Sequence, residues 1–299
     1  MDAITTGAAL TTDLSCPWPD HDPRRMARDF LVWRHLRVLR ARTMRHVHRL
    51  AARLQPAREP SAVATAYGVP MIPNWNDRTY AYCHYGTYGH YLADLLLAVD
   101  RPFLFLDIGA NQGLFSLIAA RNPLCEAIVA LEPVPDTHAR LVSNLAANGL
   151  DGRARALAFG LSEHGGLHRI ACRRNHSGAA TLEGHVTRRD PHALHLTVEM
   201  RTVRDLAPCL SRDLPIFVKI DVEGHEAHVI APLLQSRFAD RIMALFYEHD
   251  RRWSDAPAMD DVLARAGFGI RRRYGPARHH DVLALPLGPG TATTASMIA

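Results

Sequence analysis

Lysine, acidic and histidine side chains stand close together in the octapeptide K-I-D-V-E-G-H-E, residues 219–226. Its first residues complete the apolar strand predicted over Ile216–Ile220. Alternate side chains of a strand share a face, so Lys219 and Asp221 should lie together. A hydroxyl is a poor nucleophile at neutral pH and needs a general base or a metal. We predict Asp221 as a catalytic residue, either an orienting carboxylate or a metal ligand, and His225 as a candidate base. Lys219 could orient Asp221 or contact the acceptor; the competing interpretation is a structural Lys219–Asp221 ion pair.

A second group of reactive side chains follows the next apolar run. Residues Ile242–Phe246 predict a strand, and the tetrapeptide Y-E-H-D, residues 247–250, comes directly after it. Adjacent parallel strands end at the same edge of a sheet, so Glu248 should lie beside Asp221. Two hypotheses are open. Asp221 and Glu248, with Asp250 or His249, could bind Mg²⁺ or Mn²⁺, or His249 could act as a metal-free base.

Two glycines four residues apart follow a further apolar strand. The segment Phe103–Gly113 reads F-L-F-L-D-I-G-A-N-Q-G, in which Gly109 and Gly113 let a ligand approach the backbone closely. The helix after them begins with free N–H groups that attract a carboxylate, and Asp107 can reach an ammonium group. Glu132 stands 25 residues after Asp107, at the end of the next apolar run, where an acid can bind both hydroxyls of a ribose.

This glycine turn excludes two common kinds of nucleotide site. It lacks the G-x-G-x-x-G spacing of dinucleotide-binding enzymes, and the chain contains no G-K-[S/T] phosphate loop. A ligand with an amino acid at one end and a ribose at the other fits better. S-adenosylmethionine has both groups, and we predict it as the cofactor.

The elements that must position these residues alternate between strand and helix. Continuous apolar strands that alternate with helices predict an α/β fold with a doubly wound, mostly parallel sheet, whose ligands bind at the carboxyl ends of the strands. The predicted strands are Phe103–Asp107, Ala127–Leu131, Ala154–Leu157, Leu167–Ala171, His195–Thr202, Ile216–Ile220, Ile242–Phe246, and an antiparallel pair, Phe268–Arg272 and Asp281–Leu285. The predicted helices are His90–Ala98, Leu114–Arg121, Thr137–Asn148, Ala227–Leu234 and Asp260–Ala266.

Two other segments have open interpretations. Residues 57–100 are rich in tyrosine and are predicted as irregular structure before the first helix of the domain. Their aromatic side chains could line the mouth of a pocket or form a minor core. The polar segment Arg173–Gly178 could cover the substrate or be a plain hairpin tip.

Four segments combine into a specific pattern: L-D-I-G-A-N-Q-G (106–113), L-E-P-V-P (131–135), Leu161-Ser162 and V-K-I-D-V-E-G-H-E (218–226). This combination closely resembles the FkbM family of S-adenosylmethionine-dependent methyltransferases. The resemblance extends from about Tyr85 to Pro286. It implies a class I methyltransferase fold, which is Rossmann-like, and usually the O-methylation of a hydroxyl on a sugar, a glycan or another natural product.

The resemblance also implies roles for individual residues of the cofactor site. Glu132 would bind the ribose, and Ser162 would flank the adenine. The family usually carries an acid in a G-x-[Y/F]-E pattern before the domain, where this chain has G-T-Y-G at residues 86–89, which puts one upstream cofactor contact in question. Four residues would hold the methionine end: Asp107, Gly109, Asn111 and Gly113.

Composition excludes several classes of protein. The chain has 299 residues, 47% hydrophobic and 22% charged, which excludes a disordered chain, a collagen-like chain and a coiled-coil rod. Its five cysteines include no C-x-x-C pair, which disfavours a zinc cluster or a disulfide framework and favours a reducing compartment. The sequence shows no secretory signal and no apolar stretch of the roughly 18–20 residues that span a bilayer. We expect a cytoplasmic protein without a transmembrane segment.

Arginine is concentrated in one N-terminal segment. Residues 24–54 contain ten arginines and one acid, and apolar residues recur at steps of three and four from Val32 to Leu54, which predicts an amphipathic helix. This helix could pack on the catalytic domain or on a second subunit, or it could bind an anionic membrane surface, nucleic acid or an acidic partner. The predicted organisation is a tail and arginine helix (1–60), a methyltransferase domain (61–286) and a flexible C-terminal tail (287–299).

The leading hypothesis is therefore an O-methyltransferase that acts on a small molecule or a glycan. The alternative is a nucleic-acid methyltransferase that uses the arginine helix to bind phosphates. The chain contains no N-P-P-Y or D-P-P-Y tetrad, which enzymes acting on amino nitrogens carry. A non-enzymatic binding module is a third hypothesis, and the intact acids Asp107, Glu132 and Asp221 argue against it.

Overall fold

A computed structural model describes residues 21, 26, 32–54, 61–173, 175–182, 193–253 and 256–287 of the chain. The predicted C-terminal tail (287–299), apart from Leu287, and most of the N-terminal tail before the arginine helix lie outside the described residues. In the described part, no helix has the length and apolar character needed to cross a bilayer.

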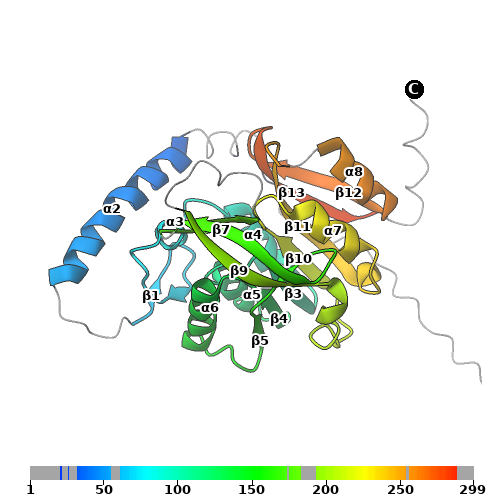
Figure 1. Cartoon of the computed structure of the whole chain (residues 1–299), viewed down its shortest axis with the longest axis horizontal. Coiled ribbons are helices and arrows are strands. Elements are labelled where there is room, and N and C mark those ends of the chain that lie inside the picture. Colours follow the sequence, from blue (N-terminus) through cyan, green and yellow to red (C-terminus); the bar gives the residue numbers. More distant parts are fainter. Residues whose placement is uncertain are drawn as a thin grey trace, which may run out of the picture.

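A seven-stranded sheet forms the centre of the fold (Figure 1). Its strand order is β12-β13-β11-β10-β3-β4-β5, and β13 alone runs antiparallel to its neighbours. The predicted doubly wound, mostly parallel α/β sheet is confirmed, including the antiparallel pair at the end of the chain. The strands are β3 (Phe103–Ile108), β4 (Cys125–Leu131), β5 (Ala154–Leu157), β10 (Ile216–Ile220), β11 (Ile242–Asp250), β12 (Phe268–Tyr274) and β13 (His279–Pro286).

Helices cover both faces of this sheet because its central strands are apolar on both sides. All residues of β3 and β10 are buried. Phe103 and Phe105 of β3 belong to a core with α4, α5 and α6, whereas Leu104 and Leu106 belong to a second core with α7 and α8. The helices follow the predicted ones within a few residues: α4 (His90–Ala98), α5 (Leu114–Ala120), α6 (Pro135–Ala147), α7 (Glu226–Leu234) and α8 (Ala256–Arg265).

The register of the parallel strands aligns their carboxyl ends. Asp107 of β3 lies beside Lys219 of β10, and Ile220 lies beside Tyr247 of β11. On the other side, Ile108 pairs with Leu131 of β4. The glycine turn, the K-I-D-V-E-G-H-E octapeptide and the Y-E-H-D tetrapeptide therefore leave the sheet along one edge, as predicted.

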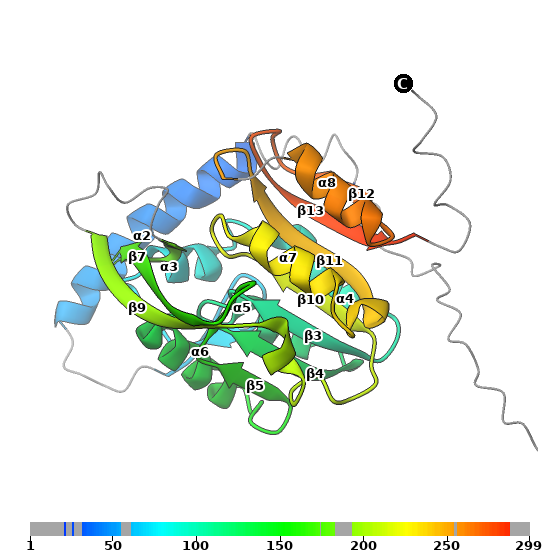
Figure 2. The same cartoon turned by 45° about the vertical axis from the view of Figure 1, so that its right-hand side comes forward.

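A second, four-stranded sheet lies next to this edge (Figure 2). Its strand order is β6-β9-β7-β8. The two extra strands predicted in this region are confirmed as β7 and β9, but β8 had no predicted counterpart. Its hairpin reaches α3, where the amide of Gly178 donates to the hydroxyl of Thr79 at 2.9 Å. The strands are β6 (Gly160–Leu161), β7 (Gly166–Arg173), β8 (His176–Leu182) and β9 (Ala193–Arg201), and short 3-10 helices span Val203–Leu206 and Ala239–Arg241.

The tyrosine-rich segment before β3 contains more regular structure than predicted. It forms β1 (Val63–Ala64), β2 (Pro70–Met71) and a helix, α3 (Arg78–Tyr85). The carboxylate of Asp77 caps α3 by accepting from the amide of Thr79 at 2.6 Å. Gly86 ends the helix at a left-handed φ of 60°. The prediction of irregular structure was wrong for Arg78–Tyr85, whereas most of the other described residues between 61 and 89 are irregular as predicted.

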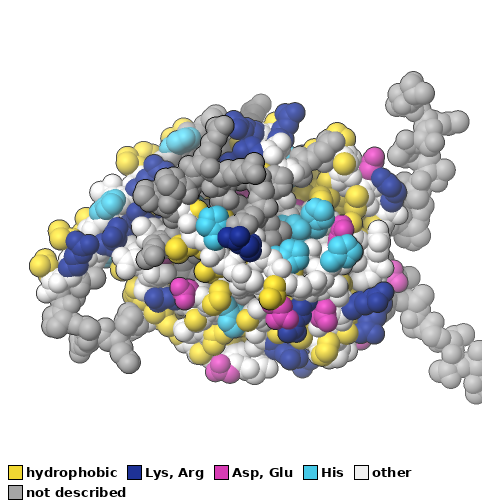
Figure 3. Space-filling view, viewed as in Figure 1, with side chains coloured by type: hydrophobic (Ala, Val, Ile, Leu, Met, Phe, Trp, Pro, Cys, Tyr) yellow, Lys and Arg dark blue, Asp and Glu magenta, His cyan; other side chains and the backbone are white. Residues whose placement is uncertain are grey.

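The arginine helix, α2 (Arg34–Leu54), lies along α3 at the edge of the molecule in both views. Its packed face holds Ala41, which is fully buried, and Arg45, which is 9% exposed. The apolar row is on the opposite face, where Leu39 is 63% and Leu50 is 59% exposed. Figure 3 shows basic and apolar side chains together along α2. The predicted apolar face is present, but in the described structure it does not pack on the domain.

Candidate active site

A cavity of about 830 Å³ opens at the carboxyl edge of the central sheet. Gly109, Glu132 and Asp221 line it from the ends of β3, β4 and β10, and the β7–β8 hairpin, α2 and α3 contribute further walls. The strand order reverses between β3 and β10, which makes this edge the switch point where doubly wound sheets bind ligands. The volume lies within the roughly 300–1,000 Å³ of small-molecule sites.

Gly109 and Asn111 of the glycine turn have a left-handed backbone conformation. Gly109 has a φ of 74°, and a Cβ atom there would lie 1.9 Å from the carbonyl oxygen of Asp221. Asn111 also has a left-handed φ, 51°, which is uncommon for a residue with a side chain. The requirement for glycine at Gly109 is therefore steric, because the turn passes against the backbone that follows β10.

Glu132 is fixed by the same turn. One of its carboxylate oxygens accepts the amide of Asn111 at 3.0 Å, and the other accepts the amide of Val134 at 2.9 Å. Burial raises the pKa of Glu132 to about 7. Each oxygen keeps a second lone pair, so the carboxylate can still accept hydrogen bonds from a ligand's hydroxyls. The predicted ribose-binding acid thus lines the cavity in a fixed orientation.

The β7–β8 hairpin contacts the glycine turn directly. The hydroxyl of Ser177 donates to the side-chain oxygen of Asn111 at 2.9 Å, and the amide of Ser177 donates to Asp77 at 3.1 Å. Arg173 and His176 line the cavity from the same hairpin. Of the two interpretations of Arg173–Gly178, the structure favours the one in which this segment forms part of the site.

Asp107 has a different position from the one predicted. It is fully buried and outside the lining of the cavity, so it is not placed to hold the methionine ammonium. Its carboxylate lies 3.2 Å from the ammonium of Lys219 and accepts the hydroxyl of Ser116 at 2.8 Å. Gly113 is likewise outside the lining; its φ of 92° starts α5, where a Cβ would lie 2.7 Å from Leu141.

Lys219 contacts both the glycine turn and the end of β10. Its ammonium donates to the carbonyl oxygen of Gly109 at 2.6 Å and lies 3.7 Å from Asp221. Burial acts to lower the pKa of Lys219, but the carboxylates of Asp107 and Asp221 outweigh it and raise the pKa above its usual value. Lys219 is therefore a charged group that joins the glycine turn to β10.

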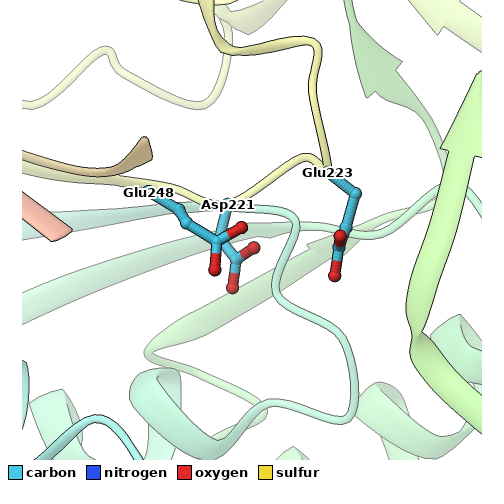
Figure 4. A group of neighbouring side chains, drawn as sticks. All are labelled: Asp221, Glu223 and Glu248. Carbon is cyan, nitrogen blue, oxygen red and sulfur yellow. The ribbon is translucent and has the colours of Figure 1, made fainter. Parts of the chain in front are cut away.

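Three carboxylates gather at the ends of β10 and β11. Oxygens of Asp221, Glu223 and Glu248 lie within 4.8 Å of one another, and Figure 4 shows all three side chains directed to the same side. Burial, opposed by Lys219, raises the pKa of Asp221 to about 6. Burial and the neighbouring Glu248 raise the pKa of Glu223 to about 9. This arrangement can hold a proton among its members or bind a cation.

Three further residues surround these carboxylates: His279 and Asp281 of β13, and Arg252 of the loop between β11 and α8. His279 lies 3.1 Å from Glu248 and 3.0 Å from Asp250, and its hydrogen bond to Glu248 raises its pKa to about 9. Burial and then Glu248 raise the pKa of Asp281 to about 8. Arg252 forms an ion pair with Asp250. Asp250 is therefore already paired with Arg252 and His279. The third carboxylate of the group is Glu223 and not a residue of the Y-E-H-D tetrapeptide as predicted.

His249 and His225 have different positions. His249 is 1% exposed, its ring packs 4.9 Å from that of His280, and it does not line the cavity, so the structure does not support it as the base. Alternation along β11 directs Glu248 to the cavity and His249 to the other face. His225 does line the cavity, with its Nε2 3.1 Å from the hydroxyl of Ser162, and burial lowers its pKa to about 4. Ser162 itself lies behind His225 and is not a lining residue.

Both interpretations of the tyrosine-rich segment hold in part. Tyr82 and Tyr88 reach the cavity from α3 and from the turn after it, whereas Tyr80 is fully buried in the core. Other lining residues were missed. His279 and Asp281 were missed because β13 was predicted to pair only with β12. The polar letters H-H-D at the start of this apolar strand were the available signal.

Comparison with known proteins gives one match to a sequence family. The sequence model described as the methyltransferase FkbM domain matches residues 107–270. The methyltransferase sdnD of Sordaria araneosa is 27% identical over 204 residues, which are 60% of this chain and 78% of that protein.

Solved structures with a similar chain trace were also found. A methyltransferase FkbM from Methylobacillus flagellatus is 16% identical, with a TM-score of 0.42, over 72% of this chain and 56% of that one. A putative tRNA (m1A22) methyltransferase of Streptococcus pneumoniae, in complex with S-adenosyl-L-methionine, is 13% identical, with a TM-score of 0.41, over 67% of this chain and 72% of that one.

Proposed function

Because the chain belongs to the methyltransferase FkbM domain family, we propose that it transfers a methyl group from S-adenosylmethionine to a hydroxyl of a sugar, a glycan or another natural product. The fold is that of a class I methyltransferase, with the antiparallel strand β13 inserted between β11 and β12. One observation carries the proposal: Glu132 and Asp221 line a single cavity on either side of the Gly109 turn.

The residues around the glycine turn fit the cofactor. Gly109 lets the turn pass directly against the backbone of Asp221 while it lines the cavity, and Glu132 presents a carboxylate already oriented by two backbone amides. S-adenosylmethionine supplies a methyl group bonded to a positively charged sulfur, which is a good leaving group. Glu132 would accept the ribose hydroxyls, and the free backbone of the turn would face the methionine end.

Asp221 is the proposed general base for the acceptor hydroxyl. Its raised pKa of about 6 keeps it mostly ionised at neutral pH, yet basic enough to accept a proton as the new carbon–oxygen bond forms. Glu223, with a pKa of about 9, is protonated at neutral pH and can donate a hydrogen bond to a neighbouring carboxylate. Lys219 is a positioning residue that holds Asp221 against the glycine turn.

The nucleic-acid alternative is not favoured by any specific observation. It was prompted by the arginines of α2. Arg40 and Arg53 are exposed there, but the same surface also exposes an apolar row that includes Leu36 and Leu39, whereas Arg34, Arg37 and Arg42 line the cavity.

Calorimetric titration of S-adenosylmethionine tests the cofactor site. Glu132→Ala should lower the affinity at least about tenfold, because it removes hydrogen-bond acceptors and leaves the amides of Asn111 and Val134 without partners. Glu126→Ala, at the exposed start of the same strand, is the matched control and should bind as the wild type does. Unchanged affinity in Glu132→Ala would remove this residue from the ribose role, and absence of binding by the folded wild type would overturn the proposed function.

A further inference from the structure

Three arginines from separate elements line one wall of the cavity. Arg42 comes from α2, Arg78 from α3 and Arg173 from the end of β7. We call these three residues the basic wall. His176 lies among them, with its ring 6.3 Å from that of Tyr82, whose hydroxyl accepts a 3.5 Å hydrogen bond from Arg42. Most of the acidic lining residues, including Asp221 and Glu248, lie at the other end of the site, on the sheet edge.

The positive charge of this wall acts on its neighbours. Burial lowers the pKa of His176, Arg78 lowers it further against the opposing effect of Asp77, and Arg173 and Arg45 add smaller contributions in the same direction as Arg78. Burial also lowers the pKa of Arg45, and Arg78 adds to the effect. Arg45 stands behind the wall on the packed face of α2, only 9% exposed, and its Nε and Nη1 atoms have no hydrogen-bond partner. Arg78 and His176 are half-buried, whereas Arg42 and Arg173 are exposed, so the wall is a cationic surface open to the cavity. A bound anion would offset the repulsion between its guanidinium groups.

In the described part of the chain, Asp77 is the acid next to Arg78 and His176, and its carboxylate already accepts the amides of Thr79 and Ser177. Among the described residues, neither Arg42 nor Arg78 forms an ion pair with an acid. The wall is therefore suited to bind a negative group that belongs to a ligand, and guanidinium groups favour the oxygens of phosphate and carboxylate.

We propose that the acceptor carries an anionic oxygen group, phosphate or carboxylate, that binds at the basic wall while the hydroxyl to be methylated lies at Asp221. This proposal rests on the proposed function and adds the class of acceptor. The opposite charges at the two ends of the cavity set the orientation: an anionic group is attracted to the arginines and repelled by the carboxylates around Asp221. The hydrogen bond from Ser177 to Asn111 ties the hairpin that carries Arg173 to the cofactor turn.

Binding of simple sugar probes to the full-length protein tests the proposal. The protein is first saturated with S-adenosylhomocysteine, so that the cofactor's own carboxylate has its place filled. Glucose 6-phosphate, glucuronate and glucose are then titrated separately. We expect one or both anionic probes to bind at least about tenfold more tightly than glucose, since charge-assisted hydrogen bonds are the strong ones. Preference for glucose 6-phosphate identifies phosphate, and preference for glucuronate identifies carboxylate.

Single charge-removing variants locate the anion. Arg42→Gln and Arg78→Gln should each weaken the preferred anionic probe about tenfold and leave the affinity for S-adenosylhomocysteine unchanged. Arg53→Gln removes an exposed arginine from the same helix, outside the cavity, and should change neither. Circular dichroism shows whether each variant is folded.

Three results would overturn the proposal. The first is equal binding of the three probes, or none at concentrations up to about 10 mM, by protein that binds S-adenosylhomocysteine. The second is the same small effect in Arg42→Gln, Arg78→Gln and Arg53→Gln. The third is a loss of S-adenosylhomocysteine affinity in Arg42→Gln and Arg78→Gln, which would assign the wall to the cofactor's carboxylate. Failure of the proposed function is separate, because it appears as absence of cofactor binding by the wild type.

Discussion

Asp221 lies between a positively charged ammonium group and two further acids. It lies 3.7 Å from Lys219 and belongs to the group of acids with Glu223 and Glu248. The ammonium favours its ionised form, whereas burial and the acids favour its protonated form. The balance leaves a carboxyl group that titrates close to neutral pH, which suits a proton acceptor.

Asp221→Asn should lower turnover about 100-fold or more, because it keeps the shape of the side chain and removes the base. Affinity for S-adenosylmethionine, measured by calorimetry, should change little. Turnover of the wild type should rise with pH through about 6, as Asp221 loses its proton, and this rise should vanish in Asp221→Asn. Near-normal turnover in Asp221→Asn would show that this strand end is not the reaction side.

Metal dependence distinguishes the two roles open to these acids. If Asp221 acts as a base, a chelator such as EDTA should leave turnover unchanged. Mg²⁺ or Mn²⁺ bound by Asp221, Glu223 and Glu248 would instead make activity fall with EDTA and return with added metal. Recovery with metal would assign these carboxylates as ligands.

At the residue scale, the sequence predicted which acids lie at the ends of strands, but not always whether each side chain lines the cavity. Glu132 and Asp221 line the cavity as predicted. Asp107 lies on the same face as its strand partner Lys219, but Lys219 and Ser116 cover its carboxylate, so it is fully buried. His249 is outside the lining for another reason: it stands one residue after Glu248 on β11. A one-residue step reverses the direction of a side chain, and the sequence leaves the exact strand end uncertain by more than that.

The turn after β3 illustrates how an element determines the geometry of the site. Gly109→Ala should abolish cofactor binding and lower the melting temperature, because its Cβ would lie 1.9 Å from the Asp221 carbonyl oxygen. Gly149→Ala is the matched control: it also has a left-handed φ, 67°, but no atom within 4 Å of the added Cβ. It should cost only the conformational strain of about 1–2 kcal/mol. Similar thermal and binding effects in both variants would contradict the close-approach explanation.

α2 belongs to the proposed acceptor wall, and the residues proposed for the cofactor lie in other elements. We expect a chain shortened to begin at Pro60 to keep its affinity for S-adenosylmethionine and to lose its preference for anionic sugars, since Arg42 and Arg45 are removed. Calorimetry measures both affinities, and circular dichroism verifies that the shortened chain is folded. Loss of cofactor binding by a folded shortened chain would place α2 in the cofactor site.

The elements of the sheet were predictable because their apolar runs are continuous, as in β3 and β10. The helix α3 was not, since its sequence R-T-Y-A-Y-C-H-Y is aromatic and resembles a strand as much as a helix. The direction of α2 could not be predicted either. Periodicity locates its apolar row correctly, but which face packs on the domain depends on tertiary contacts of Ala41 and Arg45.

At the scale of the whole molecule, three titrating groups of the site should lower the free energy of unfolding as the pH rises. Glu223 and Asp281 have pKa values of about 9 and 8, so the folded chain holds protons that the unfolded chain has lost. His279, with a pKa of about 9, is charged when folded and neutral when unfolded over the same range. All three stabilise the fold less as pH rises, so the melting temperature should fall between about pH 7 and pH 9.

Thermal unfolding at several pH values measures this effect. Glu223→Gln removes one of the three titrating groups and should flatten the decline. Glu126→Gln, which changes an exposed surface acid, should leave the decline as it is in the wild type. A melting temperature that rises from pH 7 to pH 9 would contradict the assignment of retained protons to this group of acids.

Lys219 is the only lysine in the 299 residues, and it is 4% exposed in a central strand. A protease specific for lysine therefore has one peptide bond to cut, and it can reach that bond only after β10 has separated from β3 and β11. Cleavage yields two fragments, of 219 and 80 residues, in a single step. The rate of this cut reports the opening of the sheet at the reaction centre itself, and a bound cofactor, which favours the closed form, should slow it.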